Sequence, residues 1–213
     1  MNTHLHVDLK PYPFPEGMAI PRLMPFQTFP WNGDGYLAAE VLRLKEAHNI
    51  MSAIETGTCL GSTMIWLGEQ FAAVDTVEVN DAFRTIAQDR GLAHFENNAP
   101  WITSHAGESV EMLKKVSAGF YFLDAHWGEH CPLLDELDAI AAAKVKPCII
   151  IHDFQVPGTD FGFDRMPDGR PFDLDLIRAH LDRIYGEGGW RHRYPTQVEG
   201  AKRGWISIEP ANP

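Results

Sequence analysis

The sequence predicts an α/β fold: a doubly wound, seven-stranded, mostly parallel sheet with helices on both faces and one antiparallel strand near the C-terminus. Two observations and one general rule of chain connection lead to this prediction. From residue 35 onward, helical patterns alternate with short apolar segments, as in βαβ units. Right-handed crossovers between such strands place helices on both faces of the sheet. The last two strand-like segments are joined by a glycine-containing loop without a helix, so one of them can run antiparallel.

Each element has a local signal. Apolar residues recur at helical spacing in residues 35–49, and the second helix opens on Ser62 and Thr63, which are usual caps. Asp81 is the expected cap of the third helix, and Pro132 lies in the first turn of the fifth. The predicted helices cover residues 35–49, 61–72, 81–93, 108–116, 132–144 and 173–186. The predicted strands cover residues 50–56, 74–80, 101–107, 119–127, 147–154, 190–197 and 203–210.

A proline-rich arm, residues 1–35, precedes the predicted domain of residues 36–213. Its prolines exclude a long helix and favour extended chain. Aromatic residues lie among these prolines, so we expect the arm to pack on the domain or on a partner subunit, or to cover a site. The sequence therefore leaves a homodimer open.

Composition limits the class of function. The formal net charge of −11 opposes binding to nucleic acid, because a polyanion is repelled. No apolar run approaches the length of a membrane span, and the N-terminus lacks the pattern of a secretory signal. The three cysteines include no CxxC pair and indicate reduced thiols. We therefore expect a cytoplasmic protein that acts on small molecules, with neither nucleic acid nor membrane as partner.

The segment IETGTCLGST, residues 54–63, places an acidic residue and two glycines in the first strand-to-helix turn. Gly57 and Gly61 permit positive φ and let a ligand approach the backbone. Their GxxxG spacing differs from the GxGxxG fingerprint for a pyrophosphate. Glu55 also argues against a phosphate and favours a cationic group such as an amine. For this segment alone, a tight turn without a ligand is the alternative.

Acidic residues follow the next two predicted strands. Glu78 ends the second strand, where a carboxylate can accept hydrogen bonds from both ribose hydroxyls. Glu108 and Ser109 follow the third strand, where an adenine can lie. For Glu78, the alternative is a solvated strand end.

Together the segments IETGTCLGST, TVEVN, AGES, FYFLDAHW and IIIHDF resemble the class I S-adenosylmethionine-dependent methyltransferases. They resemble especially the small-molecule O-methyltransferases of the catechol O-methyltransferase type, which have a Rossmann-like fold. The likeness covers residues 36–210. It implies S-adenosylmethionine (SAM) as cofactor, with Glu55, Gly57 and Gly61 at its methionine part. The wider set of implied cofactor-binding residues is Glu55, Gly57, Thr58, Gly61, Ser62, Thr63, Glu78, Glu108, Ser109 and Asp124.

Two carboxylates end the fourth and fifth strands, Asp124 in FLDAHW and Asp153 in IIIHDF. These strands are neighbours in such a sheet, so the two carboxylates should share a proton or bind a cation. Mg²⁺ fits oxygen ligands, whereas His152 as a third ligand would favour Mn²⁺, Fe²⁺ or Zn²⁺. Metal-dependent members of the resembled family carry a further acid or amide after the second carboxylate, where this chain has Phe154. The predicted metal ligands are Asp124, His152 and Asp153, with a metal-free site as the alternative.

The expected reaction is methyl transfer to a hydroxyl of a small, hydroxylated or aromatic acceptor. His126 is the first candidate for the general base and His130 the second, with Asp124 orienting the base or the acceptor. The long loop of residues 159–173 is a candidate lid. Two other functions are weighed: a catalytically silent module that binds the adenosyl cofactor, and a nicotinamide-dependent dehydrogenase, which the missing GxGxxG disfavours.

Overall fold

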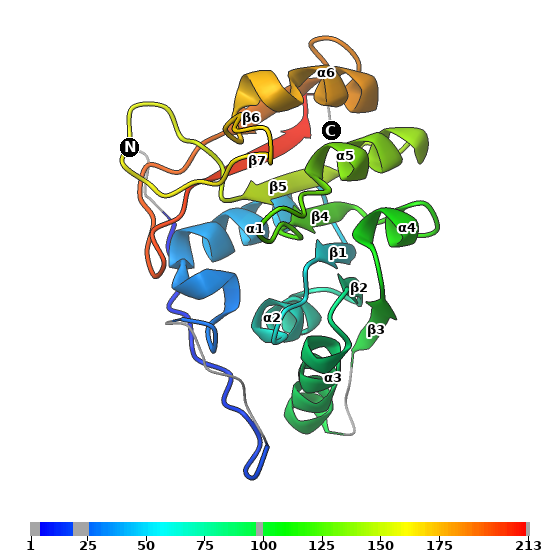
Figure 1. The fold of residues 1–213 in the computed structure, drawn as a ribbon, viewed down its shortest axis with the longest axis vertical. Helices are drawn as coiled ribbons and strands as arrows, with labels where there is room; N and C mark the ends of the chain where they lie inside the picture. Colours follow the sequence, from blue (N-terminus) through cyan, green and yellow to red (C-terminus); the bar gives the residue numbers. More distant parts are fainter. Residues whose placement is uncertain (1–4, 19–25, 97–99, 212–213) are drawn as a thin grey trace.

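The computed structural model describes residues 5–18, 26–96 and 100–211. It contains a seven-stranded sheet with the order β3-β2-β1-β4-β5-β7-β6 (Figure 1). Strands β1 to β5 pair in parallel, and β7 pairs antiparallel with both β5 and β6. The predicted fold class is confirmed. The strands are β1 (Ser52–Thr56), β2 (Ala73–Glu78), β3 (Trp101–Ala106), β4 (Phe120–Leu123), β5 (Cys148–His152), β6 (Trp190–Arg193) and β7 (Trp205–Pro210).

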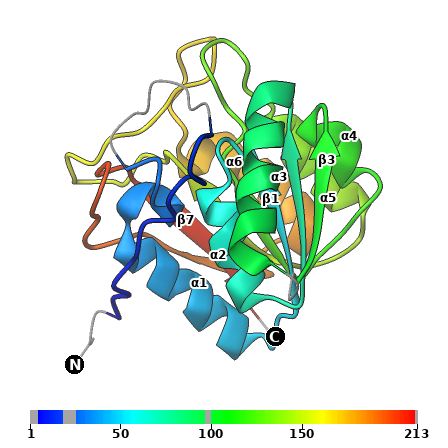
Figure 2. The same ribbon diagram turned by 90° about the horizontal axis from the view of Figure 1, so that it is seen from below.

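Helices cover both faces of the sheet (Figures 1 and 2). One face packs against α1 (Gly35–Ala47), α2 (Ser62–Gln70) and α3 (Asp81–Phe95), and the other against α4 (Ser109–Leu113), α5 (Leu133–Ala142) and α6 (Leu174–Tyr185). None of these helices, in the part of the chain that the structure describes, combines the length and apolar character needed to cross a bilayer.

The sequence of strand β4 is apolar throughout because helices cover both faces of the sheet. Phe120 and Phe122 join the core on the α1–α3 side, whereas Tyr121 and Leu123 join the core on the α4–α6 side. All four side chains are buried, because side chains of a strand alternate between two covered faces. β1 is flanked by β2 and β4, and the order of the strands reverses there. Such a switch point opens a crevice at the carboxyl ends of the strands, where doubly wound folds bind ligands.

Two helix starts differ from the predictions. The residue before α2 is Gly61, in a left-handed conformation with φ of +82°, and neither Ser62 nor Thr63 caps the helix. The cap of α3 is Asn80, whose Oδ1 accepts hydrogen bonds from the backbone N–H groups of Ala82 and Phe83. Asp81 is the first helical residue. In both cases the residue before the predicted cap has the backbone geometry that starts the helix.

The proline-rich arm packs on the α1–α3 side of the domain. It ends in a 3₁₀ turn, η1 (Pro30–Gly33), in which Trp31 is only 1% exposed. The indole of Trp31 packs edge-on against Trp66 of α2 and Phe122 of β4. The end of the predicted arm is therefore part of the hydrophobic core.

Candidate functional site

The loop between β1 and α2, residues 57–61, lies at the switch point, and we call it the glycine loop. Gly57 has φ of +82°, and a Cβ atom there would lie 2.6 Å from the carbonyl oxygen of Asp124. The backbone N–H of Asp124 in turn donates to the hydroxyl of Thr56, at 3.2 Å. Gly57 is therefore required for the close approach of the ends of β1 and β4, which fixes Asp124 beside the loop.

Glu78 joins the end of β2 to the glycine loop. Its Oε2 accepts the backbone N–H of Cys59 at 2.8 Å, and its Oε1 accepts the N–H of Asn80 at 2.9 Å. The residue is 8% exposed. Each carboxylate oxygen has a second lone pair that a ligand hydroxyl can use. This geometry suits the predicted ribose contact, which stays a prediction.

Glu55 lies beneath the loop and is 1% exposed. It is the register partner of Thr76 in β2, and the Thr76 hydroxyl donates to Glu55 Oε2 at 2.6 Å. The Thr58 and Thr76 hydroxyl oxygens lie 2.5 Å apart, so all three residues form one network. Burial, opposed by the Thr76 hydrogen bond, raises the pKa of Glu55 to about 8. A cationic group placed beside this carboxyl would stabilise its ionised form.

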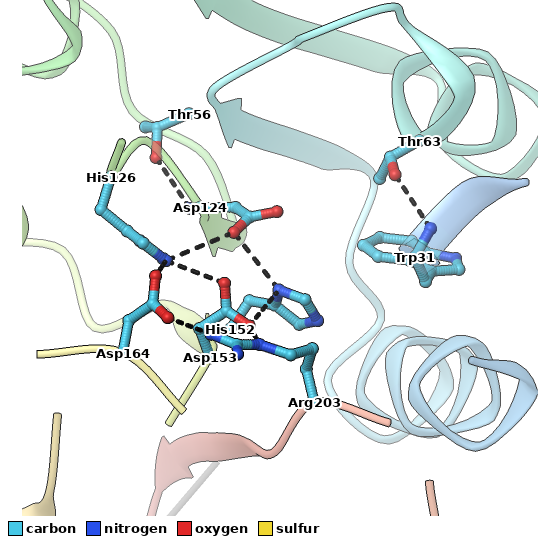
Figure 3. Close-up of polar contacts among 9 residues, drawn as sticks. All are labelled: Trp31, Thr56, Thr63, Asp124, His126, His152, Asp153, Asp164 and Arg203. Carbon is cyan, nitrogen blue, oxygen red and sulfur yellow. Dashed lines mark hydrogen bonds and ion pairs between the residues drawn. The ribbon is translucent and has the colours of Figure 1, made fainter. Parts of the chain in front are cut away.

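The arm contacts two residues predicted to bind the cofactor. The Ser62 hydroxyl donates to the carbonyl of Gln27 at 2.8 Å. The Thr63 hydroxyl accepts the N–H of Trp31 at 3.0 Å (Figure 3). Both hydroxyls are therefore used in holding the arm on α2. Their predicted contact with the cofactor is untested.

Arg90 of α3 links the arm to the glycine loop. Its guanidinium donates to the carbonyl of Leu60, to the carbonyl of Tyr12 at 2.6 Å and to the hydroxyl of Ser62 at 3.0 Å. The ring of Phe14 lies over it, with the Cζ atom 4.3 Å from the ring centroid. Because Arg90 is 1% exposed, these contacts replace water around a buried cation.

His130 is separated from the other predicted catalytic residues. Its Nε2 lies 3.1 Å from Glu108 Oε2, so it links the loop after β4 to the loop after β3. Both side chains are about half exposed. Ser109 is the first residue of α4 and is buried. Glu108 and Ser109 follow β3, which pairs with β2, the strand that ends at Glu78; their contact with an adenine stays a prediction.

Four of the predicted residues converge beyond the ends of β4 and β5 (Figure 3). His126 Nε2 lies 2.9 Å from Asp153 Oδ2 and 3.9 Å from Asp124 Oδ1. His152 Nδ1 lies 3.3 Å from Asp124 Oδ1 and 3.5 Å from Asp153 Oδ1. The two histidines thus lie between the two carboxylates. We call these four residues, with Asp164 and Arg203, the acid–base cluster.

Asp164 and Arg203 are not among the site residues predicted from the sequence. Asp164, from the loop of residues 159–173, places its Oδ2 3.3 Å from His126 Nε2. The Arg203 guanidinium, just before β7, donates from Nε to Asp153 Oδ1 and from an Nη atom to Asp164 Oδ1. The antiparallel direction of β7 could have indicated the position of Arg203, because the start of an antiparallel strand lies at the edge of the sheet where β5 ends.

The carboxylates set the protonation of the histidines. Burial lowers the pKa of His126, but hydrogen bonds to Asp153 and Asp164 outweigh it and raise the pKa to about 10. Burial also lowers the pKa of His152, but the negative charges of Asp153 and Asp124 outweigh burial and raise this pKa well above its ordinary value. Burial disfavours the charged form of Asp153, yet its cationic neighbours lower its pKa. At neutral pH the imidazole of His126 is therefore held as a cation in this arrangement.

Asp153 is also conformationally unusual, with φ of +55°. A non-glycine residue in the left-handed region costs free energy, and such residues concentrate at functional sites. The backbone is held there by the N–H of Asp164, which donates to the carbonyl of Asp153 at 2.8 Å. The loop of residues 159–173 is thus fastened to the end of β5 through both backbone and side chain.

The predicted ligands for a metal lie close together, but Asp153 already has other partners. Ligand atoms of Asp124, His152 and Asp153 lie within 4.8 Å of one another, as a metal site needs. However, Arg203 binds Oδ1 of Asp153 and His126 binds Oδ2. A divalent ion at this site would therefore have to displace these contacts of Asp153.

No protein-family model matches the sequence. No curated protein matches it either.

Solved structures share the fold at low sequence identity. An O-methyltransferase from Bacillus cereus in complex with SAH is 17% identical, with a TM-score of 0.58, over 80% of this chain and 79% of the other. The O-methyltransferase TomG from Streptomyces achromogenes, involved in tomaymycin synthesis and solved with SAM, is 15% identical, with a TM-score of 0.58, over 83% and 80%. A putative caffeoyl-CoA O-methyltransferase from Staphylococcus aureus is 19% identical, with a TM-score of 0.52, over 81% and 83%. The chain therefore has the Rossmann-like fold of the class I SAM-dependent methyltransferases, the fold of these O-methyltransferases.

Proposed function

We propose that this protein is a SAM-dependent methyltransferase that transfers a methyl group to a hydroxyl of a small molecule. The observation that carries the proposal is the position of Glu78. Its carboxylate ends β2, is fixed by two backbone N–H groups and borders the glycine loop at the switch point. A dinucleotide or nucleoside ribose is bound by an acid at this place in doubly wound folds. The B. cereus protein and TomG were solved with SAH and SAM, respectively, in the same fold.

Charge at the crevice supports a cationic cofactor. Glu55, Glu78 and Asp124 follow one another around the loop at the ends of β1, β2 and β4. The charges of Asp124 and Glu78 help to raise the pKa of Glu55, so an added cation relieves their mutual repulsion. SAM carries an ammonium and a sulfonium, and when bound it supplies the electrophilic methyl group.

We assign to Asp124 the role of receiving the acceptor proton. Its Oδ1 faces His152 and His126, whereas its Oδ2 has no hydrogen-bond or ion-pair partner among the described residues (Figure 3). Its side chain is 24% exposed, more than that of Asp153. In the transfer, the acceptor O–H bond breaks, its proton moves to Asp124, and a new O–CH₃ bond replaces the S–CH₃ bond. Holding the hydroxyl in line with the methyl supplies much of the rate, ~7–11 kcal/mol in favourable cases.

His126 remains the alternative base. An imidazolium cannot accept a proton. His126 would therefore first have to lose the proton that it shares with Asp153 and Asp164. The divalent cation expected from the sequence would similarly require Arg203 to leave Asp153.

Turnover on a panel of hydroxylated acceptors tests the proposal. The purified protein is incubated with SAM and phenols, catechols and aliphatic alcohols, with and without EDTA, and methylated products are detected by mass spectrometry. Methylation of at least one acceptor class is expected. Binding of SAM without transfer to any of them would favour the catalytically silent module.

A further inference from the structure

The guanidinium of Arg203 pairs with Asp153, one of the predicted metal ligands. It contacts Oδ1 of Asp153 through Nε and Oδ1 of Asp164 through an Nη atom. One fork-shaped group therefore bridges the end of β5 and the loop of residues 159–173 (Figure 3). Arginine carries a permanent charge, and its planar fork matches carboxylate oxygens.

The fold provides a fitted place for this side chain. The backbone N–H of Gly162 donates to the carbonyl of Lys202 at 3.0 Å, and the N–H of Gly204 donates to the carbonyl of Gly162 at 2.8 Å. A Cβ atom at Gly162 would lie 2.9 Å from Arg203 Cδ, so the absence of a side chain there leaves room for the arginine. The N–H of Phe154 donates to the carbonyl of Gly204 at 2.9 Å. Arg203 is thus held from both sides by backbone hydrogen bonds.

Both oxygens of Asp153 already face a basic side chain. One oxygen accepts from Arg203, and the other lies 2.9 Å from His126. A divalent ion bound between Asp124 and Asp153 would lie within a few ångströms of the guanidinium. Two positive charges at such a distance repel each other, and most strongly where little water screens them.

We propose that Arg203 takes the place of the metal: it is a fixed, internal cation that holds Asp153 and Asp164, so the site works without a divalent ion. Arg203 is then a positioning residue, which acts on the acceptor through the carboxylates. The acceptor needs one hydroxyl beside Asp124 and no neighbouring pair of oxygens to chelate an ion. This inference concerns the site of the proposed transfer, but it can be tested without cofactor or acceptor.

The test measures Mn²⁺ binding by electron paramagnetic resonance of free Mn²⁺, on protein first dialysed against EDTA. The wild-type protein is expected to leave Mn²⁺ free, whereas Arg203→Ala, which exposes the carboxylates, should bind one equivalent at least about tenfold more tightly. Arg203→Lys keeps the charge and should resemble the wild type. Arg178→Ala, which removes a guanidinium of α6 that lies 4.0 Å from Asp175, is the matched control and should also bind no Mn²⁺.

Stoichiometric Mn²⁺ binding by the wild-type protein would overturn the proposal, and so would an Arg203→Ala variant that binds no more tightly than wild type. If Arg203→Ala does not fold, the wild-type and Arg203→Lys titrations decide, and Mn²⁺ uptake by either contradicts the proposal. In turnover assays, EDTA should leave the rate with a single-hydroxyl acceptor unchanged. A rate that EDTA abolishes and Mg²⁺ or Mn²⁺ restores would contradict it. A protein that binds neither SAM nor Mn²⁺ would contradict the proposed function and leave the inference about Arg203 standing.

Discussion

The Nε2 atom of His126 lies 2.9 Å from Oδ2 of Asp153, and this contact joins the loop after β4 to the end of β5. Asp164 adds a second carboxylate oxygen at 3.3 Å from the same nitrogen. The imidazole is 9% exposed, so its charge is stabilised by these carboxylates in place of water. The histidine predicted as general base is therefore placed as a donor that holds two acids together.

The protonation of His126 has a consequence for stability. Its pKa rises from 6.5 to about 10 on folding, because its hydrogen bonds to Asp153 and Asp164 outweigh the cost of burial. Its contribution is fully present below 6.5 and is lost as the pH rises through the folded-state pKa. The stability advantage of the wild type over His126→Gln should therefore be largest at about pH 6 and shrink by about pH 10. Thermal unfolding followed by circular dichroism measures the stability of both proteins at each pH. A stability difference that does not change with pH would contradict a protonated His126 bound to Asp153 and Asp164.

The two candidate bases, Asp124 and His126, lead to different expected effects of mutation on kcat. If Asp124 accepts the proton, Asp124→Asn should lower kcat by ~10²–10⁴-fold in a variant that still binds SAM. His126→Gln should lower kcat less, because it only loosens Asp153 and Asp164. Single-turnover kinetics of both variants on one acceptor decide. The reverse order of effects would assign the base to His126.

Glu55→Gln is expected to stabilise the free protein and weaken cofactor binding. Burial raises the pKa of Glu55 from 4.5 to about 8, so stability is lost as the pH rises through this range. Glutamine carries no charge to bury, and the variant should unfold about 3–10 °C above the wild type at about pH 9. The gain should nearly vanish at about pH 4. Calorimetric scans at both pH values check the sign, and a variant less stable than wild type at high pH would refute the burial argument.

Arg90 is expected to be essential for the arm. Arg90→Ala leaves the carbonyls of Leu60 and Tyr12 and the hydroxyl of Ser62 without their donor, at a cost of about 2–4 kcal/mol. The Tm should fall on the order of 5–10 °C.

The matched control is Arg84→Ala in the same helix, where the guanidinium pairs with the exposed Asp81. Such surface pairs contribute about 0–1 kcal/mol, so this Tm should change little. Equal decreases in Tm for the two variants would mean that the contacts of Arg90 with the arm and the loop stabilise the protein no more than a surface ion pair does.

The convergence of Asp124 and Asp153 could be predicted from the sequence. The alternation of helices and strands fixes β4 and β5 as parallel neighbours, and each aspartate comes one residue after its strand. The role of Gly57 was only partly predictable. A glycine before a helix indicates positive φ, but the carbonyl of Asp124 that approaches it comes from a distant part of the chain.

The rest of the cluster depends on long-range contacts that no local pattern encodes. Asp164 is one of several acidic residues in a loop without periodicity. Arg203 could be placed only once β7 was known to run antiparallel beside β5. Ser62 and Thr63 follow the glycine loop, as ligand-binding hydroxyls would, yet in the structure both hydroxyls bond to backbone groups of the arm, and that of Ser62 also to Arg90.

Titration of the protein with SAM by isothermal calorimetry tests the central claim most directly. The wild type is expected to bind SAM and not a nicotinamide dinucleotide. Glu78→Ala should lose ~2–4 kcal/mol of binding free energy, a rise in Kd of roughly 30- to 1,000-fold. Asp75→Ala, on the same strand but paired with His105, is the control and should bind as wild type does. A folded wild-type protein that gives no heat with SAM, or a folded Glu78→Ala variant with unchanged affinity, would contradict the account.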